Sequence, residues 1–269
     1  MRTKLYFSTL MQITFLGTGT SQGVPLIACE CSVCISTNEK DKRLRTSILV
    51  QEKGLNIVVD SGPDFRQQML RCGIKRLDAL LFTHAHKDHI AGMDDIRGFN
   101  FKMKSAVDVY CSEQVEQQMR QEFHYIFSDF KYPGIPELKI HRIDKNSTID
   151  VKGIAIQALE VMHYKLPVLG FRFGGFVYIT DANFISEQEK EKIKGCDTLV
   201  LNALRREQHI SHFSLQEALD LIAELKPKQA YLTHISHQLG LHDDVSKELP
   251  ENVFLAYDNQ QIECDYEHS

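Results

Sequence analysis

The chain has 269 residues, of which 43% are hydrophobic and 25% charged, and it contains seven cysteines and twelve histidines. This is the composition of a folded globular protein, which excludes collagen-like, disordered and low-complexity chains. The formal net charge of −5 gives no global attraction for nucleic acid or for an anionic membrane surface. No hydrophobic run approaches the ~20 residues of a membrane span.

The cysteines have to be interpreted in the light of the cellular compartment. The basic residues near the start are followed by only a short hydrophobic run with polar interruptions, so we expect no signal peptide. We therefore expect a cytoplasmic, reducing environment, in which cysteines are metal ligands or buried thiols rather than disulfides. Residues 1–10 are expected to form an extension ahead of the first strand.

Short hydrophobic runs punctuated by Gly and Asp predict many strands. We expect strands over residues 13–16, 46–51, 56–59, 79–82, 107–110, 139–142, 154–160, 170–173, 176–179, 198–201, 229–232 and 253–256. One helix is predicted from Asp64 to just before Gly73. Two more follow the capping-box patterns Ser186-Glu-Gln-Glu189 and Ser214-Leu-Gln-Glu217.

Strands outnumber helices, and they occur both as hairpin-like pairs and as units separated by helices. This pattern favours a layered α/β fold with mixed sheets over a doubly wound parallel sheet. No linker, repeat or shift in composition divides the chain, so we expect one domain over residues 1–269. Residues 113–139 form an aromatic-rich insertion that is a candidate lid or homodimer interface, and simple packing onto the core explains it equally well.

Three of the predicted strands end in threonine followed at once by a potential metal ligand. The residues concerned are His84, Asp181 and His234. Because the ends of aligned strands meet at one edge of a sheet, we expect these side chains to converge there.

The segment after the first of these strands carries four ligand-type side chains in six residues, namely His84, His86, Asp88 and His89. Such a density suits two ions better than one tetrahedral ion. His163 can add to the first ion, Asp181 can bridge both, and His234 can complete the second. Imidazole and carboxylate ligands suit Zn, Mn or Fe and give no firm choice among these metals.

In their order and spacing these residues resemble the motif of the metallo-β-lactamase superfamily, and the resemblance runs from Ile13 to about Asp258. It implies an α/β fold of the αββα sandwich type, with two mixed β-sheets flanked by helices and a metal site at one edge. It further implies that His84, His86 and His163 hold one ion, that Asp88, His89 and His234 hold the other, and that Asp181 bridges them. A ligand set without cysteine is similar to that of the phosphodiesterase and ribonuclease branches rather than to that of the true β-lactamases.

A second cluster of ligand-type residues is Cys29-Glu-Cys31-Ser-Val-Cys34. Three thiolates lack the fourth ligand of a tetrahedral zinc, which His237 can supply three residues after His234. We therefore expect a structural zinc at these four residues, with three reduced cysteines as the alternative. The remaining cysteines are scattered and are expected to be ordinary core or surface residues.

This cysteine cluster, after the loop Gly17-Thr-Gly-Thr20, is similar to that of the PhnP-type cyclic phosphodiesterases. The resemblance implies a structural zinc beside a two-metal site and a small ribose-type cyclic phosphodiester as substrate. It also places His212 at the position of the family's additional active-site histidine.

The expected function is a two-metal-dependent phosphodiesterase, in which hydroxide held between ions roughly 3.5–4 Å apart attacks phosphorus. Asp88 is expected to orient this nucleophile as well as to bind metal, and His212 to protonate the leaving alkoxide. The alternatives are a tRNA 3′-processing-type ribonuclease, disfavoured by the negative charge, and a non-catalytic metal-binding module, disfavoured by the complete ligand set. Arg43, Arg45 and Arg172 are candidates for phosphate binding, with a solvated arginine as the simpler interpretation.

Overall fold

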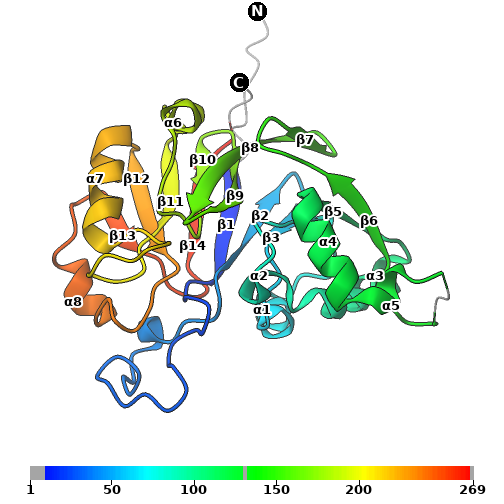
Figure 1. Cartoon of the computed structure of the whole chain (residues 1–269), viewed down its shortest axis with the longest axis horizontal. Coiled ribbons are helices and arrows are strands. Elements are labelled where there is room, and N and C mark those ends of the chain that lie inside the picture. Colours follow the sequence, from blue (N-terminus) through cyan, green and yellow to red (C-terminus); the bar gives the residue numbers. More distant parts are fainter. Residues whose placement is uncertain (1–9, 130–131, 267–269) are drawn as a thin grey trace, which may run out of the picture.

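The computed structural model describes residues 10–129 and 132–266. In this part of the chain the strands form two seven-stranded sheets, which pack face to face with helices on both outer sides (Figure 1). The predicted αββα sandwich is thereby confirmed. Every helix in the described ranges is too short or too polar to cross a lipid bilayer. Of the expected N-terminal extension, residues 1–9 lie outside the described residues, and Leu10 already belongs to the first strand.

The first sheet has the strand order β14-β1-β2-β3-β4-β5-β6. Its pairs are antiparallel from β14 to β3 and parallel from β3 to β6. The strands are β1 (Leu10–Gly17), β2 (Ser47–Glu52), β3 (Leu55–Val59), β4 (Ala79–Leu81), β5 (Val107–Cys111), β6 (Leu138–Arg142) and β14 (Gln261–Asp265).

The second sheet has the strand order β13-β12-β11-β10-β9-β8-β7. It is antiparallel from β7 to β10 and parallel from β10 to β13. The strands are β7 (Thr148–Val151), β8 (Ile154–His163), β9 (Leu166–Phe173), β10 (Phe176–Tyr178), β11 (Thr198–Asn202), β12 (Gln229–Thr233) and β13 (Val253–Leu255).

The helices divide between the two outer faces, as Figure 1 shows. On the side of the first sheet lie α1 (Phe65–Cys72), α2 (Lys87–Ile90), α3 (Arg97–Met103), α4 (Glu113–Glu122) and α5 (His124–Phe127). On the side of the second sheet lie α6 (Glu187–Ile193), α7 (Leu215–Leu225) and α8 (His242–Ser246). Two short 3-10 helices cover Glu39–Asp41 and Met93–Ile96.

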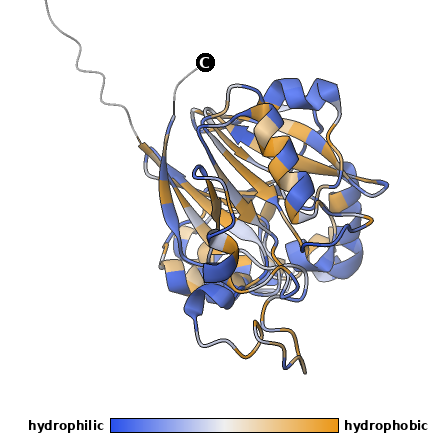
Figure 2. Cartoon of the chain, turned by 90° about the vertical axis from the view of Figure 1, so that its left-hand side faces the viewer, coloured by the Kyte–Doolittle hydropathy of each residue, from blue (hydrophilic) through white to orange (hydrophobic). Residues whose placement is uncertain are grey.

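Side chains that point alternately to the two faces of each sheet form three apolar layers. In β2, Ile48 and Val50 face the space between the sheets, whereas Leu49 faces the helices. In β12, Tyr231 faces inward and Leu232 faces α7. Figure 2 shows the hydrophobic residues gathered on the strands and the hydrophilic ones on the outer surfaces of the helices. Burying each such aliphatic side chain stabilises the fold by about 1.5–3 kcal/mol.

Several elements differ from the sequence-based predictions. β7 and β14 were not predicted, because both are short and at least half of their residues are polar. β9 begins at Leu166 and passes through Pro167, a residue that argues against a strand but is tolerated here. The capping box at Ser214 is present, but the one predicted at Ser186 is only half formed. The carboxylate of Glu189 accepts instead from the Glu160 N–H, at 2.9 Å.

Most of the described aromatic side chains of the insertion pack onto the protein. Phe123 is buried in the outer layer of the first sheet, and the Tyr125 hydroxyl donates to Asp94 at 2.5 Å. Tyr132 is the exception, with 71% of its surface exposed. Residues 130–131 lie outside the described residues. A role of this segment as lid or homodimer interface stays a prediction, as does the single domain over residues 1–269.

Candidate metal centre

The ends of three strands from both sheets bring ligand-type side chains to one edge of the sandwich. His84 follows β4 in the first sheet, while Asp181 and His234 follow β10 and β12 in the second. Asp181 and His234 have φ angles of +53° and +55°, a left-handed conformation that costs L-residues roughly 1–2 kcal/mol. Such strained residues cluster at functional sites, where the surrounding structure holds them.

The first ligand group consists of His84, His86 and His163, each offering one ring nitrogen within 4.8 Å of the others. His84 Nε2 lies 3.0 Å from His86 Nδ1. The Nδ1–H of His163 donates to the carbonyl of Ser211 at 2.8 Å, which leaves Nε2 free to bind a cation. Such a hydrogen bond from the second ring nitrogen is the usual support of a metal-binding histidine.

The second ligand group consists of Asp88, His89, Asp181 and His234. His89 Nε2 lies 3.1 Å from Asp88 Oδ2, and His234 Nε2 lies 3.1 Å from Asp181 Oδ1. Despite this proximity, both Nε2 atoms lack a hydrogen-bond partner among the described residues, although both side chains are buried. A buried, unpartnered polar atom costs about 1–3 kcal/mol. A divalent cation shared by these atoms would remove that cost, so the donor set fits a metal.

The charges of this second group also fit a cation. Burial opposes the charged form of His234, but Asp181 and Asp88 outweigh it and raise its pKa to about 9. Burial likewise opposes the charge of Asp88, but His89 and His234 outweigh it and lower the pKa of this carboxyl. The carboxylates thus draw positive charge into a buried position, which bound metal ions would supply in place of protons.

His212 lies against both ligand groups. Its Nε2 is 3.0 Å from Asp181 Oδ1, and its ring also lies within reach of His163. Burial lowers the pKa of His212 to about 4, and the hydrogen bond to Asp181 only partly opposes this shift. His212 is therefore placed where it can contact either a bound substrate or a metal ion.

Asp60 was not predicted from the sequence, and it forms a hydrogen bond with a residue of the second ligand group. This fully buried residue follows β3, and its Oδ2 accepts from His89 Nδ1 at 2.7 Å. It also accepts from the N–H and the hydroxyl of Thr83 at 2.9 and 2.8 Å. Its one sequence signal is weak: Asp60 follows a hydrophobic strand, but it lacks the preceding threonine that marks His84, Asp181 and His234.

We expect Asp60→Asn to weaken metal binding without removing a ligand. The amide cannot accept from His89 and Thr83 as the carboxylate does, so His89 loses the partner that fixes its ring. Loss of such a partner typically costs 10–100-fold in metal affinity. Competition of the protein with a chelator of known affinity measures the change. Unchanged affinity would show that Asp60 has no influence on the site.

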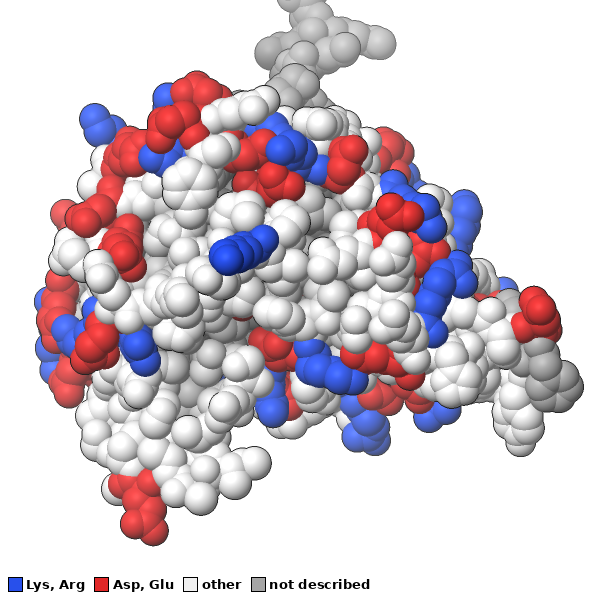
Figure 3. All heavy atoms as spheres, viewed as in Figure 1, with Lys and Arg blue, Asp and Glu red and all other residues white. Residues whose placement is uncertain are grey.

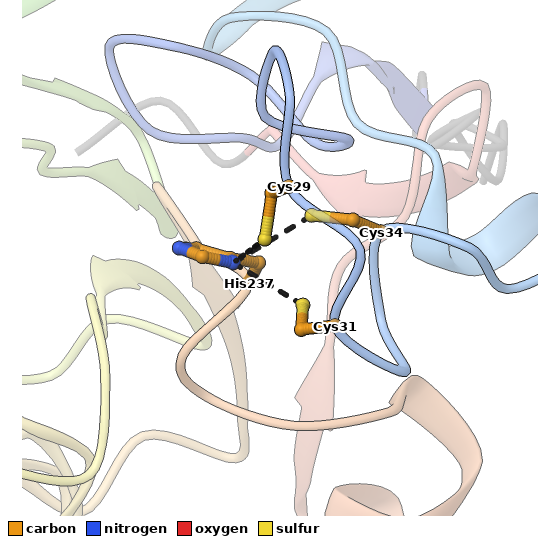
Figure 4. A group of neighbouring side chains, drawn as sticks. All are labelled: Cys29, Cys31, Cys34 and His237. Carbon is orange, nitrogen blue, oxygen red and sulfur yellow. Dashed lines mark hydrogen bonds between the residues drawn. The ribbon is translucent and has the colours of Figure 1, made fainter.

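The four residues of the cysteine cluster also meet in space (Figure 4). The sulfurs of Cys29, Cys31 and Cys34 lie 3.3, 3.3 and 3.6 Å from His237 Nδ1. Ligands of a tetrahedral zinc, with Zn–S of about 2.3 Å and Zn–N of about 2.0 Å, lie ~3.5 Å apart. The spacing therefore fits a zinc ion.

The thiols of this cluster have different pKa values. A backbone hydrogen bond from Cys34, followed by the His237 contact, lowers the pKa of Cys31 to about 6. Burial raises the pKa of Cys34 to about 11, so a bound cation would have to stabilise this thiolate. The Leu26 N–H already donates to Cys34 Sγ at 3.3 Å.

None of the three candidate arginines is free to bind a phosphate as placed here. Arg43 is buried and donates to Thr18 Oγ1 and to the carbonyl of Ala256. Arg45 forms an ion pair with Asp64 at 3.1 Å. Arg172 donates to the backbone carbonyls of residues 174, 192 and 194. These arginines stabilise loops and the β9 hairpin rather than the metal centre.

The fold and its ligand groups together define a metal-dependent hydrolase of the metallo-β-lactamase fold. Residues 55–235 match the beta-lactamase superfamily domain, and the chain belongs to this superfamily. A crystal structure described as a new diphosphatase from the PhnP family superposes with a TM-score of 0.90 and 37% identity, covering 96% of this chain and 98% of that one.

Twelve or more curated proteins match in sequence, including the following two. An octanoyltransferase of Porphyromonas gingivalis is 38% identical over 257 residues, which are 95% of this chain and 52% of that protein. A ribonuclease Z of a Bradyrhizobium species is 28% identical over 135 residues, which are 49% of this chain and 44% of that protein. The chain thus spans about half the length of these curated relatives.

Proposed function

We propose that the chain hydrolyses a small phosphodiester with two divalent metal ions. The observation that carries the proposal is the meeting of seven histidine and aspartate side chains in two adjoining groups at one sheet edge. The similarity over nearly the whole chain to a PhnP-family diphosphatase supports phosphorus chemistry. The preferred substrate is a ribose-type cyclic phosphodiester. The diphosphatase relative makes a disubstituted diphosphate the second candidate.

In this proposal His84, His86 and His163 hold one ion, and Asp88, His89 and His234 hold the other. Asp181 would bridge the two, because it lies 3.3 and 3.1 Å from His89 and His234 of the second group and also within ligand distance of His163 of the first group. The choice among Zn, Mn and Fe stays open. When bound, such ions neutralise phosphoryl charge and lower the pKa of water.

The protein side chains contribute orientation and a proton. Asp88 lies at the mouth of the second group, with 12% of its side chain exposed, and can accept a hydrogen bond from an attacking water. His212 holds a proton at Nε2 for the leaving alkoxide, a contribution of about 10²–10⁴-fold. The charge of a bound anionic diester favours the protonated form of His212 and so opposes the effect of burial on its pKa.

We further propose that Cys29, Cys31, Cys34 and His237 bind a structural zinc. The loop that carries the cysteines has only a small apolar cluster of its own, and Ile27 and Ile35 are exposed. A metal therefore supplies the stability that this loop lacks. Through His237, a bound zinc would also fix the segment that begins at His234 of the other site.

Replacing Cys31 with serine is expected to release this zinc and leave the histidine–aspartate site loaded. Destabilisation of up to about 3 kcal/mol would lower the Tm by roughly 5–10 °C. Metal analysis and thermal unfolding measure the two effects. Cys72→Ser serves as the control, because Cys72 is half-buried and lies outside all ligand groups. Equal zinc content in both variants would contradict the assignment.

A ribonuclease of the tRNA 3′-processing type is the alternative enzyme. Its support is the similarity to several ribonuclease Z proteins, which are 24–35% identical over 31–74% of this chain. Figure 3 shows Lys and Arg interspersed with Asp and Glu around the visible face, with a basic side chain near its centre and without a continuous basic field for RNA. This distribution and the net charge of −5 favour a small substrate.

The proposal is tested with the manganese-loaded protein on bis(p-nitrophenyl) phosphate, a ribose cyclic phosphate, a disubstituted diphosphate and a precursor tRNA. We expect turnover of the first two and none of the RNA. Faster hydrolysis of the disubstituted diphosphate would make this second candidate the assigned substrate class. No turnover of any substrate by fully metal-loaded protein would favour a metal-binding module and overturn the proposal.

A further inference from the structure

A shallow depression opens beside the first ligand group. It has a volume of roughly 530 Å³ and is lined by His86, His163, Tyr164, Lys165, Leu166, Ile210 and Ser211. Since two of these residues are ligands of the proposed first ion, a molecule in the depression lies directly next to the metal centre. Its volume falls in the range of about 300–1,000 Å³ that small-molecule sites occupy.

The most unusual residue of the depression is Tyr164. It forms, with Lys165, the two-residue turn between β8 and β9, and its φ is +58°. Such turns favour Gly, Asn or Asp at positions of positive φ, and a bulky residue there is strained. Tyr164 nevertheless occupies it, with half of its surface exposed. A strained, exposed aromatic residue next to a metal ligand indicates a function for its ring.

The two walls of the depression are joined by hydrogen bonds of the half-buried Asn183 side chain. Asn183 Oδ1 accepts from the Tyr164 N–H at 2.7 Å, and Asn183 Nδ2 donates to the carbonyl of Ile210 at 3.1 Å. Ile210 has 66% of its surface exposed. The hydrogen bond from His163 to Ser211 fixes the same wall to the metal centre. The depression is therefore preformed, with an aromatic ring on one side and an aliphatic side chain on the other.

We propose that this depression binds a flat ring of the substrate, of the kind that a nucleoside phosphate carries, while the phosphoryl group lies at the metal centre. This inference rests on the proposed function and adds the chemical class of the group attached to phosphorus. Tyr164 stacks on the ring, and Ile210 and Leu166 contact it. The Lys165 ammonium, 5.3 Å from the centroid of the Tyr164 ring, places a positive charge next to an anionic substrate.

The test compares the binding of adenosine 5′-monophosphate and ribose 5-phosphate to the metal-loaded protein by calorimetry. The two probes share ribose and 5′-phosphate and differ at C1′, which carries the base in the nucleotide and a hydroxyl in the sugar phosphate. Stacking of one base on an aromatic side chain corresponds to roughly 10-fold or more in affinity. We expect the nucleotide to bind at least tenfold more tightly than the sugar phosphate, and Tyr164→Ala to abolish this ratio with unchanged affinity for ribose 5-phosphate.

Three further variants distinguish the effect of losing the Tyr164 ring from an effect on the stability of the fold. Tyr164→Phe keeps the ring and should keep the ratio. Tyr164→Gly removes the ring and suits the positive φ, so we expect the ratio to fall to about one without a lower Tm. Tyr132→Ala, an exposed aromatic residue outside the depression, should change neither affinity.

Equal affinity of the wild type for both probes, or an unchanged ratio in Tyr164→Gly, would overturn the inference. If diesters are hydrolysed and ribose 5-phosphate binds, that failure concerns the depression alone. If neither probe binds and no diester is hydrolysed, the proposed function has failed as well.

Discussion

Replacing Asp181 with asparagine is expected to abolish hydrolysis and to empty at least part of the histidine–aspartate site. Asp181 is fully enclosed, and its two oxygens lie within 3.0–3.3 Å of His212, His234 and His89. Asparagine keeps the size but removes the negative charge and one of the two oxygen ligands. Because bound ions contribute several kcal/mol to such reactions, turnover should fall roughly 10³-fold or more.

The Asp181 variant is measured for metal content and for phosphodiester turnover under saturating metal. The structural zinc should remain, since its ligands lie in a separate group. The matched control is Asp220→Asn, the same change on the exposed surface of α7, where Asp220 only accepts from Gln216. Full metal content together with near wild-type turnover in Asp181→Asn would disprove the bridging role.

Replacing His212 with alanine is expected to lower turnover about 10²–10⁴-fold with the metal content unchanged. The reason is that His212 contacts Asp181 at 3.0 Å but belongs to neither of the two proposed ligand sets. The geometry also allows the opposite role, because His163, Asp181 and His212 themselves form a group within ligand distance.

Metal analysis of the His212 variant decides between these roles. Loss of an ion would make His212 a ligand and contradict its assignment as proton donor. His124→Ala is the control, a histidine-to-alanine change on the exposed side of α5. This control should leave both metal content and turnover unchanged.

The meeting of residues at the histidine–aspartate site was predictable because several of them directly follow predicted strands. His84, Asp181 and His234 each follow a hydrophobic run and a threonine, and parallel strands deliver such residues to one edge. The cysteine cluster was predictable from ligand spacing, including the contribution of His237. Both groups consist of chemically distinctive residues at short separations, which local reasoning can recognise.

Features that depend on tertiary contact were not predictable in the same way. Asp60 carries no motif, and its role becomes visible only through its hydrogen bond to His89. The left-handed conformation of Asp181 and His234 is not marked by any feature of the surrounding sequence. The same holds for Tyr164, whose aromatic side chain does not indicate a tight turn.

The ends of the strands were also not fully predictable from the local sequence. β8 continues to His163, beyond the predicted end at residue 160, because its partner β9 begins at Leu166 and pairs with it residue by residue. β14 pairs with β1 across almost the whole length of the chain. Pairing partners so distant in sequence determine where a strand ends, and local hydrophobicity does not reveal them.

Anomalous X-ray diffraction at the metal absorption edge tests most directly whether two cations lie between side chains of both sheets. We expect two peaks roughly 3.5–4 Å apart on either side of Asp181, and a third among the three cysteines and His237. Crystals of fully metal-loaded protein with no peak, or only a single one, between His84 and His234 would contradict the account.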